Sequence, residues 1–296
     1  MKLTENDIVV LSALHQYHVL SANQIHRFCF PQNRDRRATR RRLQRLVFDR
    51  FISRSPVSVA FSTGNAGPAY YLAERGAEAL AVYFDDPAYM SANIRSPRLD
   101  RLYHWLDISE THWIIRQACS RLPGVTLVRW INEWQTIYDQ AGNPTNYVLH
   151  IQFQDPPRPL SCSPDAAFLL DVGGHRRAHL VEVDRGTTGA KRVAASKMPG
   201  FSELLRVRGH QRYFPETTFD DFAVLFITAS AGRRDIVRSC VAHHADKHPD
   251  LWLFIDRREM TPETALTGNI AHDINGNPGP LVTLPDTPNV PTEGPR

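Results

Sequence analysis

Acidic residues mark the ends of two apolar runs in the second half of the chain. Asp165 follows Pro164 and begins one run, and Glu182 and Asp184 close the next. Because alternate residues of a strand share a face, Glu182 and Asp184 should point to one side of a predicted sheet. Carboxylate clusters of this kind hold hard divalent cations, and such ions promote phosphodiester hydrolysis. The spacing therefore predicts a site for Mg²⁺ or Mn²⁺ at these three carboxylates.

Two further residues are candidates for the same site. Lys197 lies downstream on a predicted helix, from which its amine could orient a water molecule or stabilise developing phosphate charge. Glu110, on the helix before the first predicted strand, is a candidate metal ligand. Acidic residues are also common at turns, where they accept backbone hydrogen bonds. Spacing alone leaves both interpretations open: ordinary turn chemistry, or a catalytic set of Asp165, Glu182, Asp184 and Lys197.

Arginines crowd one segment near the N-terminus, where residues 34–54 contain nine arginines and two aspartates. In a helix over 36–50, apolar residues fall on one side and arginines on the other. This pattern predicts a recognition helix that contacts the phosphates or base edges of double-stranded DNA. A basic face that binds RNA or protein is the alternative. The candidate DNA-binding residues are Arg36, Arg37, Arg40, Arg41, Arg45 and Arg54.

The elements around these arginines predict a winged helix-turn-helix domain over residues 1–84. Thr4 and Asp7 begin a helix over 4–17, and Ser21 and Gln24 begin a second, both with capping-box spacing. The arginine-rich helix is the third. Strands at 51–54 and 69–72 follow, separated by a turn at 64–68, and a helix over 73–83 closes the domain. Residues 85–101 are predicted to be a linker.

The second half alternates between helical and strand-like patterns, which predicts a mixed-sheet domain over residues 102–260. Helices are expected at 102–121, 194–208 and 236–248. Strands are expected at 127–131, 146–154, 165–171, 177–184, 222–228 and 251–255. Residues 261–296 are predicted to be a Pro/Gly-rich tail, with a further strand possible at 281–284. The fold class expected is α/β in this half and α+β overall.

Composition narrows the function classes. The formal net charge is only +4, so the local arginine cluster carries more information than the total. The four cysteines form no Cys-x-x-Cys pair, which argues against a zinc knuckle. Phosphate-loop and dinucleotide-binding glycine motifs are missing, so no nucleotide cofactor is expected.

Without a signal core or a long apolar run, the chain is expected to be cytoplasmic and not membrane-bound. The oligomeric state stays open, with a homodimer as one option.

The carboxylate pattern resembles the PD-(D/E)xK nuclease fold. The matching residues are Pro164, Asp165, Glu182 and Asp184. The resemblance implies a core of one helix, three strands, a second helix and a fourth strand. Asp184 stands where that pattern has a lysine. Some members carry the lysine on the following helix, which favours Lys197. A site altered in this way either still cuts DNA or binds it without cutting.

The whole chain also resembles the replication-relaxation family of plasmid and mobile-element proteins, over residues 4–230. The segments that carry the resemblance are 4–11, 70–76, 104–108, 130–133 and 182–187, with Lys197. It implies a role in the replication or mobilisation of mobile DNA, with DNA nicking as one option and other replication or mobilisation proteins as partners. A non-catalytic replication initiator or a transcriptional regulator is the alternative.

Overall fold

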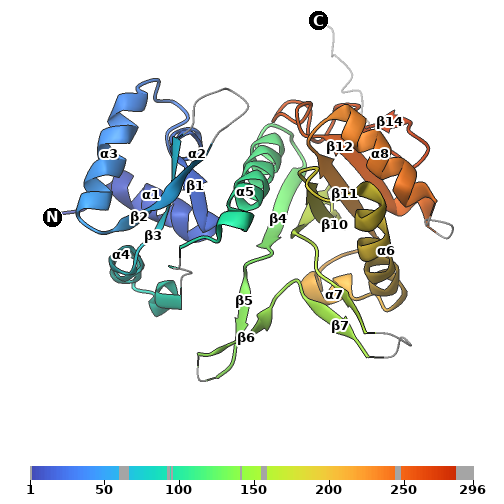
Figure 1. The fold of residues 1–296 in the computed structure, drawn as a ribbon, viewed down its shortest axis with the longest axis horizontal. Coiled ribbons are helices and arrows are strands. Elements are labelled where there is room, and N and C mark those ends of the chain that lie inside the picture. The colour runs from blue at the N-terminus through green and yellow to red at the C-terminus, as the bar shows by residue number, and fades with distance from the viewer. Residues whose placement is uncertain are drawn as a thin grey trace, which may run out of the picture. The chain divides into compact units, whose positions relative to one another are not determined.

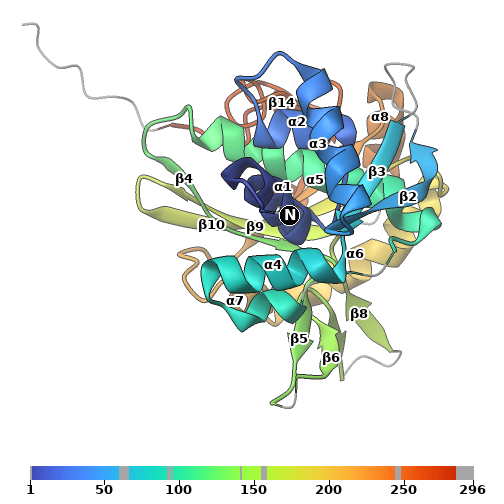
Figure 2. The same ribbon diagram turned by 90° about the vertical axis from the view of Figure 1, so that its left-hand side faces the viewer.

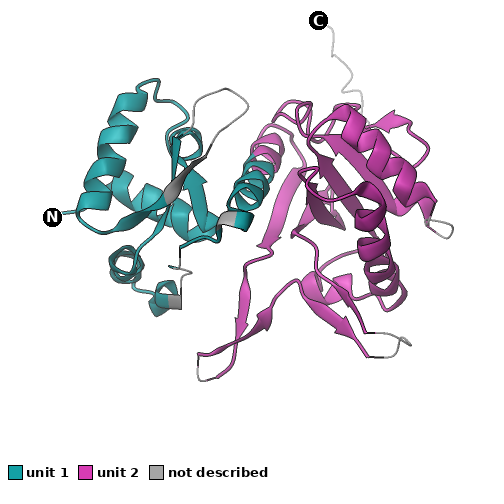
Figure 3. Cartoon of the chain, viewed as in Figure 1, with its two compact units in different colours: residues 1–113 teal, residues 114–296 magenta. Residues whose placement is uncertain are grey.

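The chain divides into two compact units in a computed structural model, residues 1–113 and 114–296 (Figure 3). The structure describes residues 2–59, 67–91, 94, 96–140, 142–154, 159–243 and 248–284. The class is mixed α+β, as predicted, with helices first and a large mixed sheet afterwards. None of the helices in the described ranges combines the length and apolarity that a membrane crossing requires.

Unit 1 contains the element order expected from the sequence. Its helices are α1 (Glu5–Tyr17), α2 (Ala22–Cys29), α3 (Arg36–Phe48) and α4 (Glu74–Phe84), followed by the 3-10 helix η1 (Pro87–Ser91). The strands β1 (Val19–Ser21), β2 (Ile52–Val59) and β3 (Gly67–Leu72) form an antiparallel sheet in the order β1-β3-β2. Figure 2 shows β2 beside β3. Strand β1 was not predicted, because its three residues are too few to show a period. The predicted turn at 64–68 falls largely outside the described residues.

Local signals in the sequence explain where the first helices begin. The Asp7 carboxylate accepts hydrogen bonds from the Thr4 backbone N and Oγ1, at 2.9 and 2.7 Å. Ser21 and Gln24 exchange bonds of 3.1 Å between side chain and backbone in both directions. Both capping boxes are therefore confirmed. Asp35 caps α3 by accepting from the Arg37 backbone N at 2.8 Å.

Unit 2 is built on a seven-stranded sheet in its described residues, ordered β14-β13-β12-β11-β10-β9-β4 (Figure 1). Strands β4 (Val125–Asn132), β9 (Ala166–Val172) and β10 (His175–Asp184) pair antiparallel, whereas β11 (Phe222–Thr228) and β12 (Trp252–Asp256) continue parallel to β10. The long helix α5 (Leu99–Cys119) crosses the division between the units. All seven residues of β11 are buried, as its continuous apolar run predicted.

Helices α6 (Ala190–Arg206) and α8 (Ala231–Ala242) cover one face of this sheet (Figure 1). The core beneath them contains alternate residues of neighbouring strands, among them Leu180, Val224, Phe226 and Phe254. The short helix α7 (His210–Tyr213) adds Tyr213 to the same core. The regular alternation of β10 is what places its acidic residues on this helix-covered face.

Three parts of unit 2 differ from the prediction. The strand expected at 146–154 is two separate strands, β6 (Pro144–Tyr147) and β7 (Ile151–Phe153), which pair with β5 (Thr136–Tyr138) and β8 (Leu160–Cys162). Residues 281–284 form no strand. The segment expected to be a loose tail instead packs as far as Val282, with Ala265 and Leu266 buried and β13 (Ala271–His272) and β14 (Pro278–Gly279) extending the sheet. Its prolines and glycines shape turns there rather than prevent packing.

Candidate functional site

Asp165 is held against β10 by backbone hydrogen bonds. Its own N–H donates to the Val181 carbonyl at 3.0 Å, and its Oδ2 accepts from the Val183 N–H at 2.7 Å. The side chain is buried. A carboxylate that accepts a backbone N–H at the end of a strand is fixed in orientation. The structure therefore brings Asp165 to the last residues of β10, where Glu182 and Asp184 lie.

Glu182 and Lys197 form an ion pair between β10 and α6. Lys197 Nζ lies 2.8 Å from Glu182 Oε1 and 2.7 Å from Oε2, and it donates to the Ser163 carbonyl at 3.1 Å. Burial lowers the pKa of Lys197, but the negative charges of Glu182 and Asp165 outweigh this effect and raise it overall. The amine is thus a fixed cation beside both carboxylates. The helix lysine reaches back to the predicted acids, as the sequence suggested.

Asp184 has a partner that the sequence did not indicate. Its Oδ2 lies 2.8 Å from Arg233 Nε and its Oδ1 lies 3.2 Å from Arg233 Nη2, while Gly186 donates its N–H to Oδ1 at 2.7 Å. Arg233 belongs to the first turn of α8 and is 49 residues away in sequence. The two-point pair fixes the guanidinium. In this arrangement Asp184 orients an arginine, and a catalytic role for it remains a prediction.

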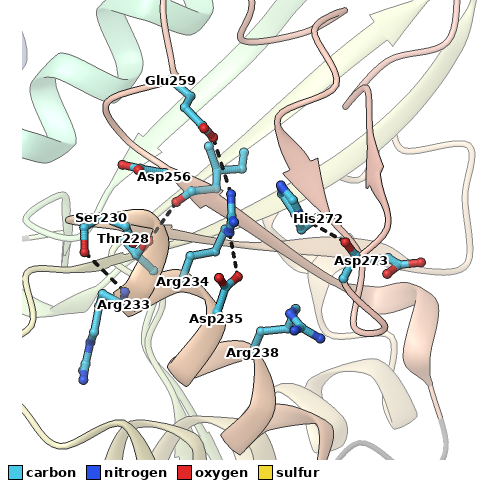
Figure 4. Close-up of polar contacts among 12 residues, drawn as sticks. Thr228, Ser230, Arg233, Arg234, Asp235, Arg238, Asp256, Glu259, His272 and Asp273 are labelled. Carbon is cyan, nitrogen blue, oxygen red and sulfur yellow. Dashed lines mark hydrogen bonds and ion pairs between the residues drawn. The ribbon is translucent and has the colours of Figure 1, made fainter.

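The end of β10 is part of a polar row across the parallel strands. Asp184 pairs in register with Thr228, and Thr228 pairs with Asp256. Figure 4 shows the neighbouring start of α8, where Ser230 Oγ accepts from the Arg233 backbone N at 3.2 Å. In the same view Arg234 lies between Asp235 and Glu259, at 3.0 and 3.5 Å. The ion pairs tie the start of α8 to the strand ends.

Two residues near Asp165 were missed by the sequence reasoning. Glu133 follows β4, its N–H donates to the Asp165 carbonyl at 3.0 Å, and an oxygen of its carboxylate lies within 4.8 Å of an Asp165 oxygen. His150 Nδ1 lies 2.7 Å from Ser163 Oγ. Glu133 could have been found, because it directly follows strand β4, which pairs with the strand that Asp165 directly precedes. His150 carries no such signal.

The carboxylates of unit 2 suit a divalent cation. Asp165 and Glu133 offer carboxylate oxygens within 4.8 Å of one another, which are the hard ligands that Mg²⁺ and Mn²⁺ prefer. Asp165 and Glu182 are both buried, which makes their negative charge costly unless a cation lies beside it. Lys197 already provides one positive charge. The carboxylates of Asp165 and Glu133 therefore suit the chemistry of a divalent cation, and a metal site that also includes Glu182 remains a prediction.

Glu110, the other predicted ligand, lies in unit 1. Both of its carboxylate oxygens accept from Arg27 Nη2, and one also accepts from Gln24 Nε2 at 3.3 Å. Arg27 in turn stacks over the Trp113 ring, 5.0 Å from its centroid. Glu110 thus joins α5 to α2 within unit 1, and its role as a metal ligand remains a prediction.

The predicted DNA-binding arginines fall into two groups. Arg36, Arg37, Arg40 and Arg41 are exposed on α3 and form no ion pair with any residue that the structure describes. Arg45 instead pairs with the buried Asp7, at 2.5 Å. A basic face without internal partners is available to an external anion, and Arg45 is the least available member of the set.

Arg54 extends this basic face onto β2. It pairs in register with Tyr70 of β3. Burial raises the pKa of the Tyr70 hydroxyl, and the positive charges of Arg54 and Arg40 partly offset that increase. Both guanidiniums therefore lie near one tyrosine, which joins the helix arginines to the strand.

The comparisons with known proteins give one result. A model of the replication-relaxation family matches residues 11–217, which include most of unit 1 and the strands that carry Asp165 and Glu182. No curated protein and no solved structure matches the chain. Because the matched residues make up more than half of its length, the chain belongs to the replication-relaxation family.

Proposed function

We propose that this protein binds double-stranded DNA through unit 1 and cuts one of its strands in unit 2, with the help of Mg²⁺ or Mn²⁺. Membership of the replication-relaxation family suggests a role in the replication or mobilisation of a plasmid or other mobile element. DNA is the substrate and partner that such a role requires. Other replication or mobilisation proteins are further partners under this proposal.

The observation that carries the proposal is the ion pair of the buried Glu182 with the half-buried Lys197, beside Asp165. The order of elements supports it: α5, then β4, β9 and β10, then α6, then β11 parallel to β10. This is the order that the resemblance to PD-(D/E)xK nucleases implies, if the ribbons β5–β6 and β7–β8 are treated as an insertion. Lys197 reaches the site from α6 and takes the place that Asp184 leaves.

Each residue has a distinct task under this proposal. Asp165, Glu182 and Glu133 would hold the metal, which when bound polarises the scissile phosphate and lowers the pKa of a bound water. Lys197 holds its proton beside two carboxylates and can donate hydrogen bonds to an attacking water or to phosphate oxygens. Apolar core residues such as Leu180 and Met198 flank Glu182 and Lys197 in the chain, and apolar surroundings strengthen such electrostatic interactions.

Unit 1 supplies DNA affinity under the same proposal, as a winged helix-turn-helix domain. The exposed arginines Arg36, Arg37, Arg40 and Arg41 lie in the first turns of α3, before its buried residues Leu43 and Leu46. Arg54 adds a positive charge on β2. Arginine guanidiniums bind phosphates through paired hydrogen bonds, and neutralising phosphates releases counterions, so affinity should fall steeply with salt.

The test is a nicking assay on supercoiled plasmid with Mg²⁺ or Mn²⁺. Wild-type protein should convert supercoiled to open-circular DNA, and Asp165→Asn or Glu182→Gln should reduce the rate at least a hundredfold. Asp171→Asn is the matched control. Asp171 lies near the far end of β9, the strand that Asp165 directly precedes, and it pairs with Arg176 at 2.8 Å. Full activity in both site variants would refute the assignment of the site.

A non-catalytic initiator or regulator is the second candidate, and the Asp184–Arg233 pair favours it. The resemblance expects a lysine where Asp184 stands, and here the side chain is engaged by Arg233. A domain of this kind would use the nuclease-like fold for binding or assembly alone. It predicts salt-sensitive DNA binding without nicking under either metal, which the same plasmid assay detects.

A further inference from the structure

We infer that unit 1 contains a second phosphate-binding site, an arginine-lined hollow where the end of α3, strand β2 and the start of α4 meet. This arginine hollow has a volume of about 640 Å³. It is separate from the arginines of the first turns of α3, because its α3 residues belong to the last turn and the helix end. Its polar lining consists of Arg50, Ser53, Arg54, Tyr71, Glu74 and Arg75.

The charge in the arginine hollow is unbalanced. Three guanidiniums line it, and Glu74 contributes the one carboxylate among its lining residues. Arg50 and Arg54 are exposed and form no ion pair within the part of the chain that the structure describes. Arg75 donates Nη1 to the Asp49 carbonyl at 2.9 Å and lies over the Phe51 ring, 4.6 Å from its centroid. Its guanidinium is therefore held in place with further N–H groups left to donate.

Arg50 occupies a backbone position that normally belongs to glycine. The Arg50 N–H donates to the Val47 carbonyl at 3.0 Å and the Phe51 N–H donates to the Leu46 carbonyl at 2.9 Å, which together form a Schellman motif at the end of α3. The motif requires a left-handed residue, and Arg50 has φ of 60°. Glycine adopts this conformation without a steric cost, so an arginine here is unfavourable for the fold. The helix end itself therefore gives Arg50 no stabilising role, and its exposed guanidinium lines the hollow.

A phosphate group is the ligand that this chemistry selects. Guanidiniums form forked hydrogen bonds with phosphate oxygens, and the Ser53 hydroxyl can donate one more. The first turn of α4 has no side-chain cap at Ala73, which also lines the hollow, so its backbone N–H groups add positive potential. The phosphate has two sources, the backbone of a nucleic acid or a free nucleotide. The site depends neither on the nuclease proposal nor on the arginines in the first turns of α3, and it shares Arg54 alone with the proposed DNA-binding set.

The experiment measures pyrophosphate binding and thermal unfolding of the full chain, with Arg50→Gly as the main variant. Wild-type protein should bind inorganic pyrophosphate in a calorimetric titration at low salt. Arg50→Gly should weaken that binding about tenfold or more, because a charge-assisted bond is lost. The same change should leave the Tm equal or higher, since glycine relieves the left-handed backbone. Arg50→Asn, which tolerates the same φ, should repeat the loss.

Arg208→Gly is the matched control. Arg208 follows the end of α6 in the same way, with φ of 50°. Its N–H donates to the Leu205 carbonyl at 3.0 Å, and the Gly209 N–H donates to the Leu204 carbonyl at 2.8 Å. It lies outside the arginine hollow, so this variant should bind pyrophosphate as the wild type does. Unchanged binding in Arg50→Gly and Arg50→Asn, or no binding by the wild type at millimolar pyrophosphate, would overturn the inference.

Two further measurements identify the source of the phosphate. If it belongs to a nucleic-acid backbone, Arg50→Gly lowers the slope of log Kd against log salt for duplex DNA by about one. If it belongs to a free nucleotide, the slope is unchanged and ATP binds more tightly than pyrophosphate. Both results support a phosphate site. Because nicking is not measured, failure of the nuclease proposal leaves this test intact.

Discussion

Asp7 connects the start of α1 to α3 in unit 1. Its carboxylate is fully buried and accepts from Thr4, from Arg42 Nη1 at 2.5 Å and from Arg45 Nη2 at 2.5 Å. Burial raises the pKa of this carboxyl group, but the bonds from Thr4 and Arg42 outweigh burial and lower it overall. The ionised form is therefore the one that the folded state stabilises.

Asp7→Asn should destabilise unit 1 by about 2 kcal/mol at pH 7, because two arginines lose a buried partner. Since the folded pKa is depressed, this contribution is present above the ordinary value of 3.8 and is lost as the pH falls through the folded pKa. Denaturant unfolding at pH 7, 5 and 3 should show the difference between variant and wild type shrinking at pH 3.

Glu5→Gln is the control for this measurement. Glu5 lies in the same helical turn but is exposed. Its replacement should change the free energy of unfolding by less than about 0.5 kcal/mol. A difference between Asp7→Asn and wild type that stays constant from pH 7 to pH 3 would contradict the ion-pair explanation.

At the scale of elements, α6 must lie close to β8 for Lys197 to reach Glu182. Gly200 makes this approach possible, since a Cβ at this position would lie 2.5 Å from the Ser161 carbonyl oxygen. Gly200→Ala should push α6 outward, destabilise the fold by about 2 kcal/mol and slow nicking, because Lys197 moves away from Glu182. Denaturant unfolding and the plasmid assay measure both effects.

Gly232→Ala, on the neighbouring helix α8, is expected to leave the stability of the fold intact, in contrast to Gly200→Ala. Gly232 also lies in a helix, α8, but a Cβ there would meet no atom within 4 Å. Alanine is the better helix former, so this variant should be as stable as the wild type or about 0.5–1 kcal/mol more stable. Equal behaviour of the two glycine variants would show that close packing is not what Gly200 provides.

Long elements with a clear period were predictable from the sequence, and short ones were not. The helix α3 and the alternation that places Glu182 on one face of β10 follow from side-chain periodicity, and the strand β11 follows from its continuous apolar run. Strands such as β5 and β8 have three residues each, and their pairing depends on tertiary context.

The same limit applies to the candidate site. Asp165, Glu182 and Lys197 could be singled out because their residue types and spacing carry a signal within one stretch of chain, and the structure brings them together. The partner of Asp184 could not be predicted from the sequence, because Arg233 is 49 residues away and reaches Asp184 only through the packing of α8. Arg50 is informative only once its left-handed φ is known, since the sequence shows simply one arginine among many.

At the scale of the whole molecule, the two units have separate cores. One is built from residues such as Leu11, Ile25 and Leu46, and the other from residues such as Leu180 and Phe226. The candidate DNA-binding arginines belong to the first unit and the buried carboxylates to the second. Separate cores allow a change on the surface of one unit without damage to the other, which makes the two proposed tasks separable by experiment.

The double variant Arg40→Gln/Arg41→Gln should therefore weaken duplex binding at least tenfold and reduce its salt dependence, because two phosphate contacts are lost. At saturating DNA its nicking rate should match the wild type, because the carboxylates are untouched. Glu182→Gln should show the reverse, with a nearly unchanged Kd and a rate near zero. Binding titrations and single-turnover nicking measure the two quantities. If the arginine variant lost nicking even at saturating DNA, α3 would be required for cutting itself, and the division of tasks between the units would be wrong.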